Sequence, residues 1–364
     1  MKIRTMSMLL LFLSAAISFS AEAGTVTKVV SDVWGRNVEI PAAVKSIVCL
    51  GSGAPRIAAY LNVMDMLVGA EESDANNFTV LRDYNPVHHE TLKALPIVGT
   101  GGGSGNNNSY PEEIVMLAPD VILAAFSPQA ADELQGQTGI PVVAVRYIST
   151  GLANETFYAA MRVFAEVLGN GARERCETIL SFIDAAKEDL NSRTSAIPDS
   201  EKLKAYAGAV TFNGQRGFAG TYSNFGPLVL INALNVADEK GKEGFYEADL
   251  EKVIVWDPDV IFLDPGNMSL VNGEYAANPN YFRSLRAARD SRVYAMPAFN
   301  YAGTNITYAL MNSYYAGIVL FPKQFADVDM AKKSAEILTL FLGRDTYDVM
   351  ADGGLHYGTI TIGE

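Results

Sequence analysis

Short apolar runs alternate with amphipathic stretches along most of the chain after residue 45. A continuous apolar run is typical of a strand in a parallel sheet that is covered on both faces, and apolar positions at helical spacing indicate the covering helices. The pattern therefore predicts an α/β protein with a mostly parallel sheet. The expected strands are 46–50, 67–70, 121–125, 142–145, 204–210, 260–263 and 292–295.

Helical spacing recurs between these strands. Ahead of the first of them, the strand-like segments 26–31 and 37–40 flank the turn Asp32-Val-Trp-Gly-Arg36, which predicts a hairpin. The expected helices are 54–61, 110–117, 130–138, 226–234, 249–255, 280–285, 305–320 and 330–342.

The segment 154–195 is helical in period, lacks a neighbouring strand and is interrupted at Gly169-Asn-Gly171. Its second part, 172–193, would extend about 33 Å at the rise of an α-helix. A long helix between two α/β regions indicates a spine that joins them. We therefore expect an N-terminal lobe at 24–153, a linking helical segment at 154–195 and a C-terminal lobe at 196–364.

An internal repeat supports two similar lobes. Residues 110–124 align with residues 248–262, and each copy runs from a helix through a Pro-Asp pair into a Val-Ile strand. Proline ends the helix because its ring and missing N–H cannot continue it. Coincidence is the alternative, since Pro-Asp before a strand is common in α/β proteins.

The N-terminus predicts export from the cytoplasm. Lys2 and Arg4 precede the apolar run 6–17, and small residues lead to a cleavage site after Ala23. This arrangement is typical of a secretory signal peptide, here 1–23, and the apolar run is too short to span a bilayer comfortably. We expect the mature protein in the periplasm of a Gram-negative bacterium.

Charge and cysteine content narrow the partners. The formal net charge is −13 and no run of Lys and Arg offsets it, so a nucleic-acid partner is not expected. Cys49 lies in an expected strand and Cys176 in an expected helix, without the CxxC spacing of a metal site. Two separate buried thiols are expected, and a disulfide in an oxidising compartment is the alternative.

Several segments together carry the pattern of a known family: the hairpin 29–41, the strands 46–50 and 67–70, Pro96-Ile-Val-Gly-Thr100, and Glu113 to Ile122 with its Ala-Pro-Asp-Val-Ile ending. The mature chain resembles the periplasmic substrate-binding proteins of ABC importers for iron-siderophore, haem and cobalamin. The resemblance implies two Rossmann-like lobes joined by a single long α-helix, with the ligand held between them.

The resemblance also implies the function. We expect capture of a metal chelate and delivery to an inner-membrane ABC permease with its ATPase, by a monomer with no resident cofactor and no enzymatic activity. One departure concerns docking, because many members carry a permease-docking glutamate where this chain has Pro55 and Arg56. The matching glutamate of the second lobe is not evident in 225–230 either.

The glycine-rich loop 99–110 raises the question of a phosphate site. It contains no Lys or Arg after Thr100, whereas a Walker loop needs a Gly-Lys-Ser/Thr ending. Because the loop follows a strand, it is expected to border the ligand cleft, with Gly102, Asn107 and Tyr110 as candidates. A surface loop and, for Tyr110, simple packing at the helix start are the alternatives.

Further candidates follow other strands. Arg56 begins the first helix, where it could pair with a ligand carboxylate or the permease, or simply be solvated. The loop 211–225 offers Arg216 to balance an anionic chelate, and Phe218 and Tyr222 to stack on a flat ligand. The loop 297–305 offers Phe299, Asn300 and Tyr301 to line the same cleft.

Direct metal ligation has weaker support. His88 and His89 are adjacent and diverge in any regular structure, and His356 lies in the tail, so no metal residues are assigned. A tyrosinate ligand to haem iron stays open. The helical stripe Tyr308, Met311, Tyr315 and Ile318 is expected to be core.

Two rival functions use the same fold. One is a chelatase-like enzyme that processes metal chelates, against which the sequence has no nucleophile elbow, paired-carboxylate motif or cysteine ligand set. The other is a ligand sensor, which an attached membrane segment would favour.

Overall fold

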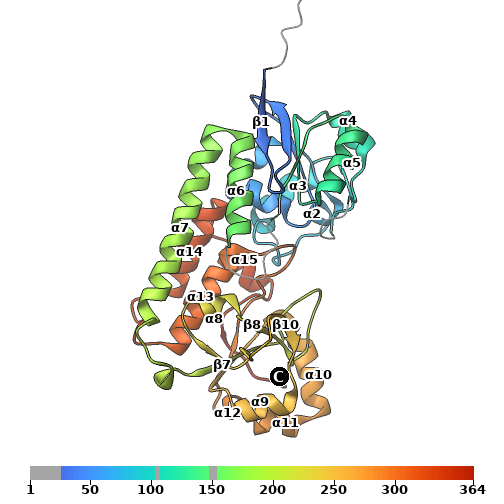
Figure 1. Cartoon of the computed structure of the whole chain (residues 1–364). Coiled ribbons are helices and arrows are strands. Elements are labelled where there is room, and N and C mark those ends of the chain that lie inside the picture. The colour runs from blue at the N-terminus through green and yellow to red at the C-terminus, as the bar shows by residue number, and fades with distance from the viewer. Residues whose placement is uncertain (1–25, 103–106, 147–153) are drawn as a thin grey trace, which may run out of the picture.

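The computed structural model describes residues 26–102, 107–146 and 154–364 (Figure 1). The predicted signal peptide lies outside these residues. Two separate parallel sheets form the framework, as the apolar runs predict. We call the residues before helix α6 (Glu155–Leu168) the N-terminal half and the residues after helix α7 (Asn170–Thr194) the C-terminal half.

The N-terminal sheet has the strand order β4-β3-β5-β6. Its strands β4 (Leu67–Gly69), β3 (Ile47–Leu50), β5 (Val121–Ala124) and β6 (Val142–Ala144) are parallel, and every residue of β3, β5 and β6 is buried. The expected hairpin is present as the antiparallel pair β1 (Thr27–Ser31) and β2 (Asn37–Pro41). The helices of this half are α1 (Ala54–Tyr60), η1 (Met64–Met66), α2 (Glu72–Ala75), α3 (Asn85–Lys93), α4 (Pro111–Leu117) and α5 (Pro128–Thr138).

The C-terminal sheet has the order β13-β12-β11-β7-β9. Its strands are β7 (Lys204–Gly208), β9 (Leu234–Asn235), β11 (Val260–Leu263), β12 (Val293–Ala295) and the antiparallel β13 (Gly358–Thr359). A separate antiparallel ribbon pairs β8 (Gly220–Ser223) with β10 (Gly244–Glu247). The short helices of this half are η2 (Asp199–Glu201), α8 (Gly226–Val229), α9 (Leu250–Trp256), η3 (Pro265–Asn267), α10 (Met268–Ala277), α11 (Pro279–Ser284) and α12 (Arg286–Arg289).

Long helices lie between and beside the sheets. The predicted break divides α6 (Glu155–Leu168) from α7 (Asn170–Thr194) at Gly169, whose φ of 98° favours glycine. Figure 1 shows α7 running along the side of both halves. The C-terminal helices α13 (Ile306–Leu320), α14 (Met330–Leu342) and α15 (Tyr347–Asp352) complete this layer.

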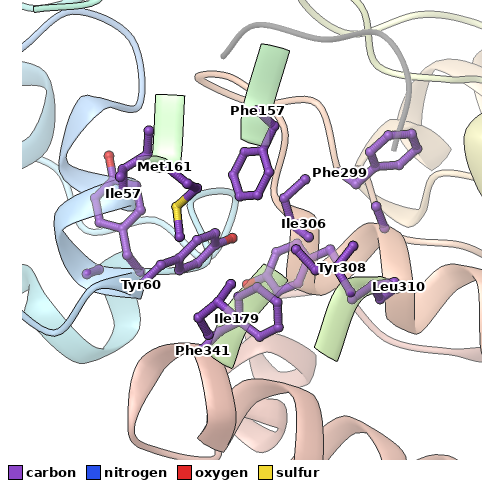
Figure 2. Packing of buried hydrophobic residues seen from close by; sticks show 14 of the residues in the cluster. Ile57, Tyr60, Phe157, Met161, Ile179, Phe299, Ile306, Tyr308, Leu310 and Phe341 are labelled. Atoms are coloured by element: carbon purple, nitrogen blue, oxygen red, sulfur yellow. The ribbon is translucent and has the colours of Figure 1, made fainter. Parts of the chain in front are cut away.

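The largest hydrophobic core crosses from one half to the other, so the expected single joining helix is not confirmed. Helix α14 contacts α1 of the N-terminal half, and α13 contacts α7. The rings of Tyr60 in α1 and Phe341 in α14 meet edge to face, with centroids 4.9 Å apart. Figure 2 shows this continuous packing through Ile57, Tyr60, Phe157, Met161, Ile179, Phe299, Ile306, Tyr308, Leu310 and Phe341.

The internal repeat has a structural reason. In both copies the helix ends on a left-handed residue directly before the Pro-Asp pair, Ala118 (φ 47°) and Asp257 (φ 47°). Asp120 then accepts hydrogen bonds from the backbone N–H groups of Lys45 (2.6 Å) and Ser46 (3.0 Å), which lead into β3. In the second copy, Asp259 accepts one from the first residue of β7 (2.8 Å). Each aspartate thus fastens the amino end of the neighbouring strand.

The structure has a shorter helix at α8 than the sequence predicts, and it contains elements that were not predicted. The expected helix 226–234 ends at Val229, because Asn232 adopts a left-handed φ of 50° before β9 begins. The ribbon strands β8 and β10 and the helices α3 and α10 were not predicted. Helix α10 has a single buried residue, Val271, and therefore shows no amphipathic period.

The structure also tests the predictions for the two cysteines and for the apolar stripe on α13. Cys49 and Cys176 are free and buried, so two separate thiols are confirmed. The stripe on α13 is core, with Tyr308 and Met311 fully buried. Within the described part of the chain, no helix combines the length and apolar character that crossing a bilayer requires.

The aspartate fastenings can be tested by substitution. Asp120→Ala removes two hydrogen bonds to backbone N–H groups, so we expect it to lower the free energy of unfolding by about 1–3 kcal/mol. Asp259→Ala should have a similar effect, since it also loses an ion pair with Arg286 (2.7 Å). Urea denaturation measures both, with the exposed Glu90→Ala as the control. Equal midpoints for Asp120→Ala and Glu90→Ala would contradict this role.

Candidate ligand-binding site

A pocket opens at the carboxyl ends of three parallel strands in the C-terminal sheet. This is the edge at which α/β folds bind ligands. Most of its lining is apolar, and Thr211, Asp264 and Asn300 supply the polar groups. The lining residues are Ala207, Gly208, Val210, Thr211, Phe225, Phe262, Leu263, Asp264, Met296, Pro297, Ala298, Phe299 and Asn300.

Asp264 fixes the polar part of this pocket. Its side chain accepts hydrogen bonds from the Thr211 hydroxyl (2.5 Å) and from the backbone N–H of Gly266 (3.0 Å). Burial raises the pKa of Asp264 to about 6, and these hydrogen bonds act against that rise. The carboxylate is therefore held by the protein itself and shapes the pocket wall.

The loop between β12 and α13 (residues 296–305, the β12–α13 loop) connects the pocket to the N-terminal half. Its first part, up to Asn300, lines the pocket. It then reverses through Ala302 (φ 49°) and Gly303 (φ 82°), and the Asn305 N–H donates to the Phe299 carbonyl (2.7 Å). The reversal aims two backbone carbonyls at the N-terminal half.

Arg56 receives these carbonyls. The residue is completely buried in α1, and its guanidinium donates to the carbonyls of Ala302 (2.7 Å) and Tyr301 (3.2 Å). It also donates to Asn305 Oδ1 (2.7 Å) and forms a salt bridge with Asp83 (2.7 Å). The alternative of a solvated helix arginine is therefore wrong, because Arg56 joins the two halves.

Asp83 is the anionic centre of this network. Besides Arg56, the hydroxyls of Tyr60 and Thr307 (2.7 Å) donate to its carboxylate, and its own N–H donates to Asn305 Oδ1 (3.0 Å). Asp83, Asn305 and Thr307 are all fully buried. A buried charge is tolerated when it is paired and hydrogen-bonded, as here.

Arg82 lies next to this network, at the contact between the N-terminal half and Tyr301 of the β12–α13 loop, which we call the seam. Its guanidinium lies over the ring of Tyr301, 5.5 Å from the centroid, and donates to the carbonyl of Ser73 (2.5 Å). Its Nε lies 3.5 Å from an oxygen of Asp74 but has no hydrogen-bond partner among the described residues. Burial raises the pKa of Asp74, whereas the charge of Arg82 and the hydrogen bond from Tyr84 oppose that rise.

Glu71 completes the polar group at the carboxyl end of β4. Its carboxylate accepts the N–H of Gly51, with N–O distances of 3.1 and 3.0 Å to its two oxygens. Burial raises the pKa of Glu71 to about 7, and the nearby charge of Asp74 adds to the rise, whereas the Gly51 N–H and Arg82 oppose it.

The structure brings four of the ten predicted residues together. Phe299 and Asn300 line the pocket, while Tyr301 and Arg56 meet at the seam beside it. Tyr222 lies one aromatic layer behind the pocket, where its ring contacts Phe225 and its buried hydroxyl has no hydrogen-bond partner within the described ranges.

Two predicted residues of the C-terminal half lie elsewhere. Phe218 is fully buried against Tyr206 and Phe282 in a separate core, so stacking of this ring on a ligand is corrected to core packing. Arg216 lies over the ring of Phe245 (5.0 Å) and 3.9 Å from Glu247.

The glycine-rich loop closes on itself through a bridge between Gly99 and Ser109. Gly101 is required there, because a Cβ at this position would lie 2.2 Å from the Ser73 hydroxyl. Gly102 is exposed, and Asn107 accepts a hydrogen bond from Ser109 (3.1 Å). Tyr110 donates to Glu72 (3.1 Å). The loop thus packs on the start of α2, with Gly103 and Asn106 outside the described residues.

Sequence reasoning missed Glu71, Arg82, Asp83 and Asn305. A signal was available for Glu71, a charged residue two positions after the end of the strand β4. Among the described residues, no cluster of three His, Cys, Asp or Glu side chains is arranged to hold a metal ion.

Glu71 makes stability depend on pH. The carboxyl titrates near 4.5 when unfolded and near 7 when folded, so between these values the folded protein retains a proton that the unfolded chain has lost. Stability contributed by this group therefore falls as pH rises through that window. We expect the stability of Glu71→Gln relative to wild type to rise by about 1–3 kcal/mol between pH 5 and pH 8. Urea titrations at both pH values measure this, and a difference that does not change with pH would contradict it.

Comparisons of this chain with known sequences and with solved structures point to the same protein family. The sequence model of the periplasmic binding protein family matches residues 47–298. The molybdate-binding protein MolA of Haemophilus influenzae is 24% identical over 346 residues, which cover 90% of this chain and 93% of that protein.

Solved structures share the fold. A periplasmic solute-binding protein of Veillonella parvula has a TM-score of 0.67 at 19% identity, covering 91% of this chain and 97% of its own. The structure of MolA bound to molybdate has a TM-score of 0.63 at 20% identity, covering 87% of this chain and 98% of its own. Because the family match spans most of both sheets, this chain belongs to the periplasmic binding proteins, the family of ABC transporter binding proteins that bind small ligands.

Proposed function

We propose that this protein captures an anionic metal species, either a metal chelate or a metal oxyanion, and delivers it to an ABC permease of the inner membrane. The solute would bind at the carboxyl-end pocket and the seam beside it. The observation that supports an anionic solute concerns Arg82. This residue is 8% exposed, and its Nε lacks a hydrogen-bond partner among the described residues.

The charge around Arg82 supports an anionic ligand. Its salt-bridge partner Asp74 stands 3.5 Å from Nε, which has no hydrogen-bond partner among the described residues, so this N–H is left to donate to a further acceptor. Charge-assisted hydrogen bonds from guanidinium groups suit both carboxylates and oxyanions. The molybdate bound by MolA is one such oxyanion, and this likeness supports the class without fixing the solute.

The pocket offers an apolar recess for part of a solute, since its enclosed space is only about 20 Å³. Phe225, Met296 and Phe299 supply apolar surface, and Thr211 and Asn300 supply hydrogen-bonding groups beside it. A mostly apolar site with few polar groups is typical of small-molecule binding. Tyr301 then connects this pocket to Arg82 across the seam.

Permease docking would differ from the common pattern of the family. The docking glutamate position corresponds to Pro55 or Arg56, and both residues are buried. Arg56 is fully engaged with the C-terminal half and cannot reach a partner protein. We therefore propose that other, exposed side chains contact the permease.

The proposal is tested by identifying the solute and then removing Arg82. Native mass spectrometry with metal analysis, on protein purified from the periplasm of its own host, should show a bound metal species. Calorimetry with sodium molybdate, haem, cobalamin and a ferric catecholate should then show binding of at least one. Arg82→Leu should weaken that binding about 10- to 100-fold, because one charge-assisted hydrogen bond is lost.

Arg289→Leu is the matched control. Arg289 is an exposed arginine of α12, which precedes β12 and therefore lies at the opposite edge of the C-terminal sheet from the pocket. Its removal changes the net charge equally and should leave affinity unchanged. A metal-free sample that binds none of the four solutes would refute the proposed function.

A further inference from the structure

We infer that Arg56, Asp83 and Asn305 form a lock that positions the β12–α13 loop against the N-terminal half before any solute binds. The lock is defined by these three residues and by the hydrogen bonds they exchange. It concerns the loop that carries Phe299, Asn300 and Tyr301, whichever solute the protein takes. Arg56 is then a positioning residue, which acts on the site through this loop.

The first observation is the direction of the hydrogen bonds from Arg56. Within its own half, its guanidinium donates to Asp83 (2.7 Å). It also donates across to the C-terminal half, to the carbonyls of Tyr301 and Ala302 and to the side chain of Asn305. The planar guanidinium satisfies all of these acceptors only in one placement of the loop.

The second observation is that Asn305 and Thr307 of the C-terminal half also form hydrogen bonds with the N-terminal half. Asn305 Nδ2 donates to the carbonyl of Leu81 (3.0 Å), and its Oδ1 accepts from the N–H of Asp83 (3.0 Å). The Thr307 hydroxyl donates to Asp83 (2.7 Å), and the Tyr308 hydroxyl donates to the carbonyl of Val80 (2.8 Å). The start of α13 is thus bonded to residues 80–83 at several points.

The surroundings of the lock are closed. The Arg56 guanidinium lies over the ring of Tyr84, 5.3 Å from the centroid of that ring. Tyr60 extends from the lock into the core and contacts Phe341 of α14. Figure 2 shows Tyr60 of α1 and Tyr308 of α13 as parts of this core. A small separation would break the hydrogen bonds before the gap could admit water to replace them. The network therefore favours one docked geometry.

The consequence for binding is preorganisation. The loop residues Phe299, Asn300 and Tyr301 already face the pocket and the seam, so a solute does not have to order them. Ordering of loops and side chains is a main cost of binding, and a loop fixed in advance avoids it. The lock also explains why Arg56 is withdrawn from the surface at the family's docking position.

Pulsed electron spin resonance on the full chain tests the lock without any solute. Spin labels are placed at Glu90→Cys in α3 and Lys240→Cys in the C-terminal half, both exposed positions, with Cys49→Ala and Cys176→Ala as background. The unliganded protein should give one narrow distance distribution. The variant Arg56→Met/Asp83→Asn, which removes both charges together, should shift part of the distribution to longer distances.

Two further variants make the result decisive. Asn305→Ala keeps the ion pair and the Arg56 bonds to the loop carbonyls but removes the Asn305 bonds to Arg56, Asp83 and Leu81. It should give a smaller shift in the same direction, so it decides the matter if the double variant fails to fold. Val293→Ala, in the separate core of the C-terminal half, should lower the melting temperature without changing the distances. This control separates the lock from a general loss of stability.

Two results would overturn the inference. One is a folded Arg56→Met/Asp83→Asn or Asn305→Ala variant with the distribution of the wild type. The other is a wild type that already shows two distances without solute. Neither result depends on metal binding, so the proposed function would stand or fall separately by its own calorimetry.

Discussion

The buried contact between Arg56 and Asp83 is the interaction on which the candidate site depends. It lies where the two halves meet, and it fixes the loop that forms one wall of the pocket. The charges are tolerated because both partners have their hydrogen-bonding groups occupied, by Asn305, Thr307 and Tyr60 in particular. Around it, the core shared by α1, α7, α13 and α14 makes the two sheets parts of one packed body.

In both sheets, the amino ends of the strands are held by the framework, whereas the loops at the carboxyl ends supply the candidate site. At the amino ends of the strands, Asp120 and Asp259 occupy the same place in the two repeated units and hold the neighbouring strands. At the carboxyl ends, the loops differ between the halves and supply the pocket, Arg82 and the β12–α13 loop. The repeat therefore records the shared framework, whereas the individual character of the site lies in the loops.

Much of the framework was predictable because it rests on local patterns. Apolar runs located the buried strands, Pro-Asp located the repeat, and Gly169 marked the helix break. The loop residues Phe299 to Tyr301 were predictable because they follow a strand. The partners of Arg56 were not, since Asp83 and Asn305 lie 27 and 249 residues away and only packing brings them together. Phe218 was misplaced because a loop sequence does not reveal which aromatic ring turns into a core.

We propose that the solute binds between Arg82, Tyr301 and the pocket beneath the β12–α13 loop. A crystal structure of the protein isolated with its own solute would locate it. We expect density for an anionic metal species within hydrogen-bond distance of Arg82, with the Arg56 contacts to the loop unchanged. A solute bound elsewhere, for example in the polar groove lined by Asn107, Ser127 and Gln137, would contradict it.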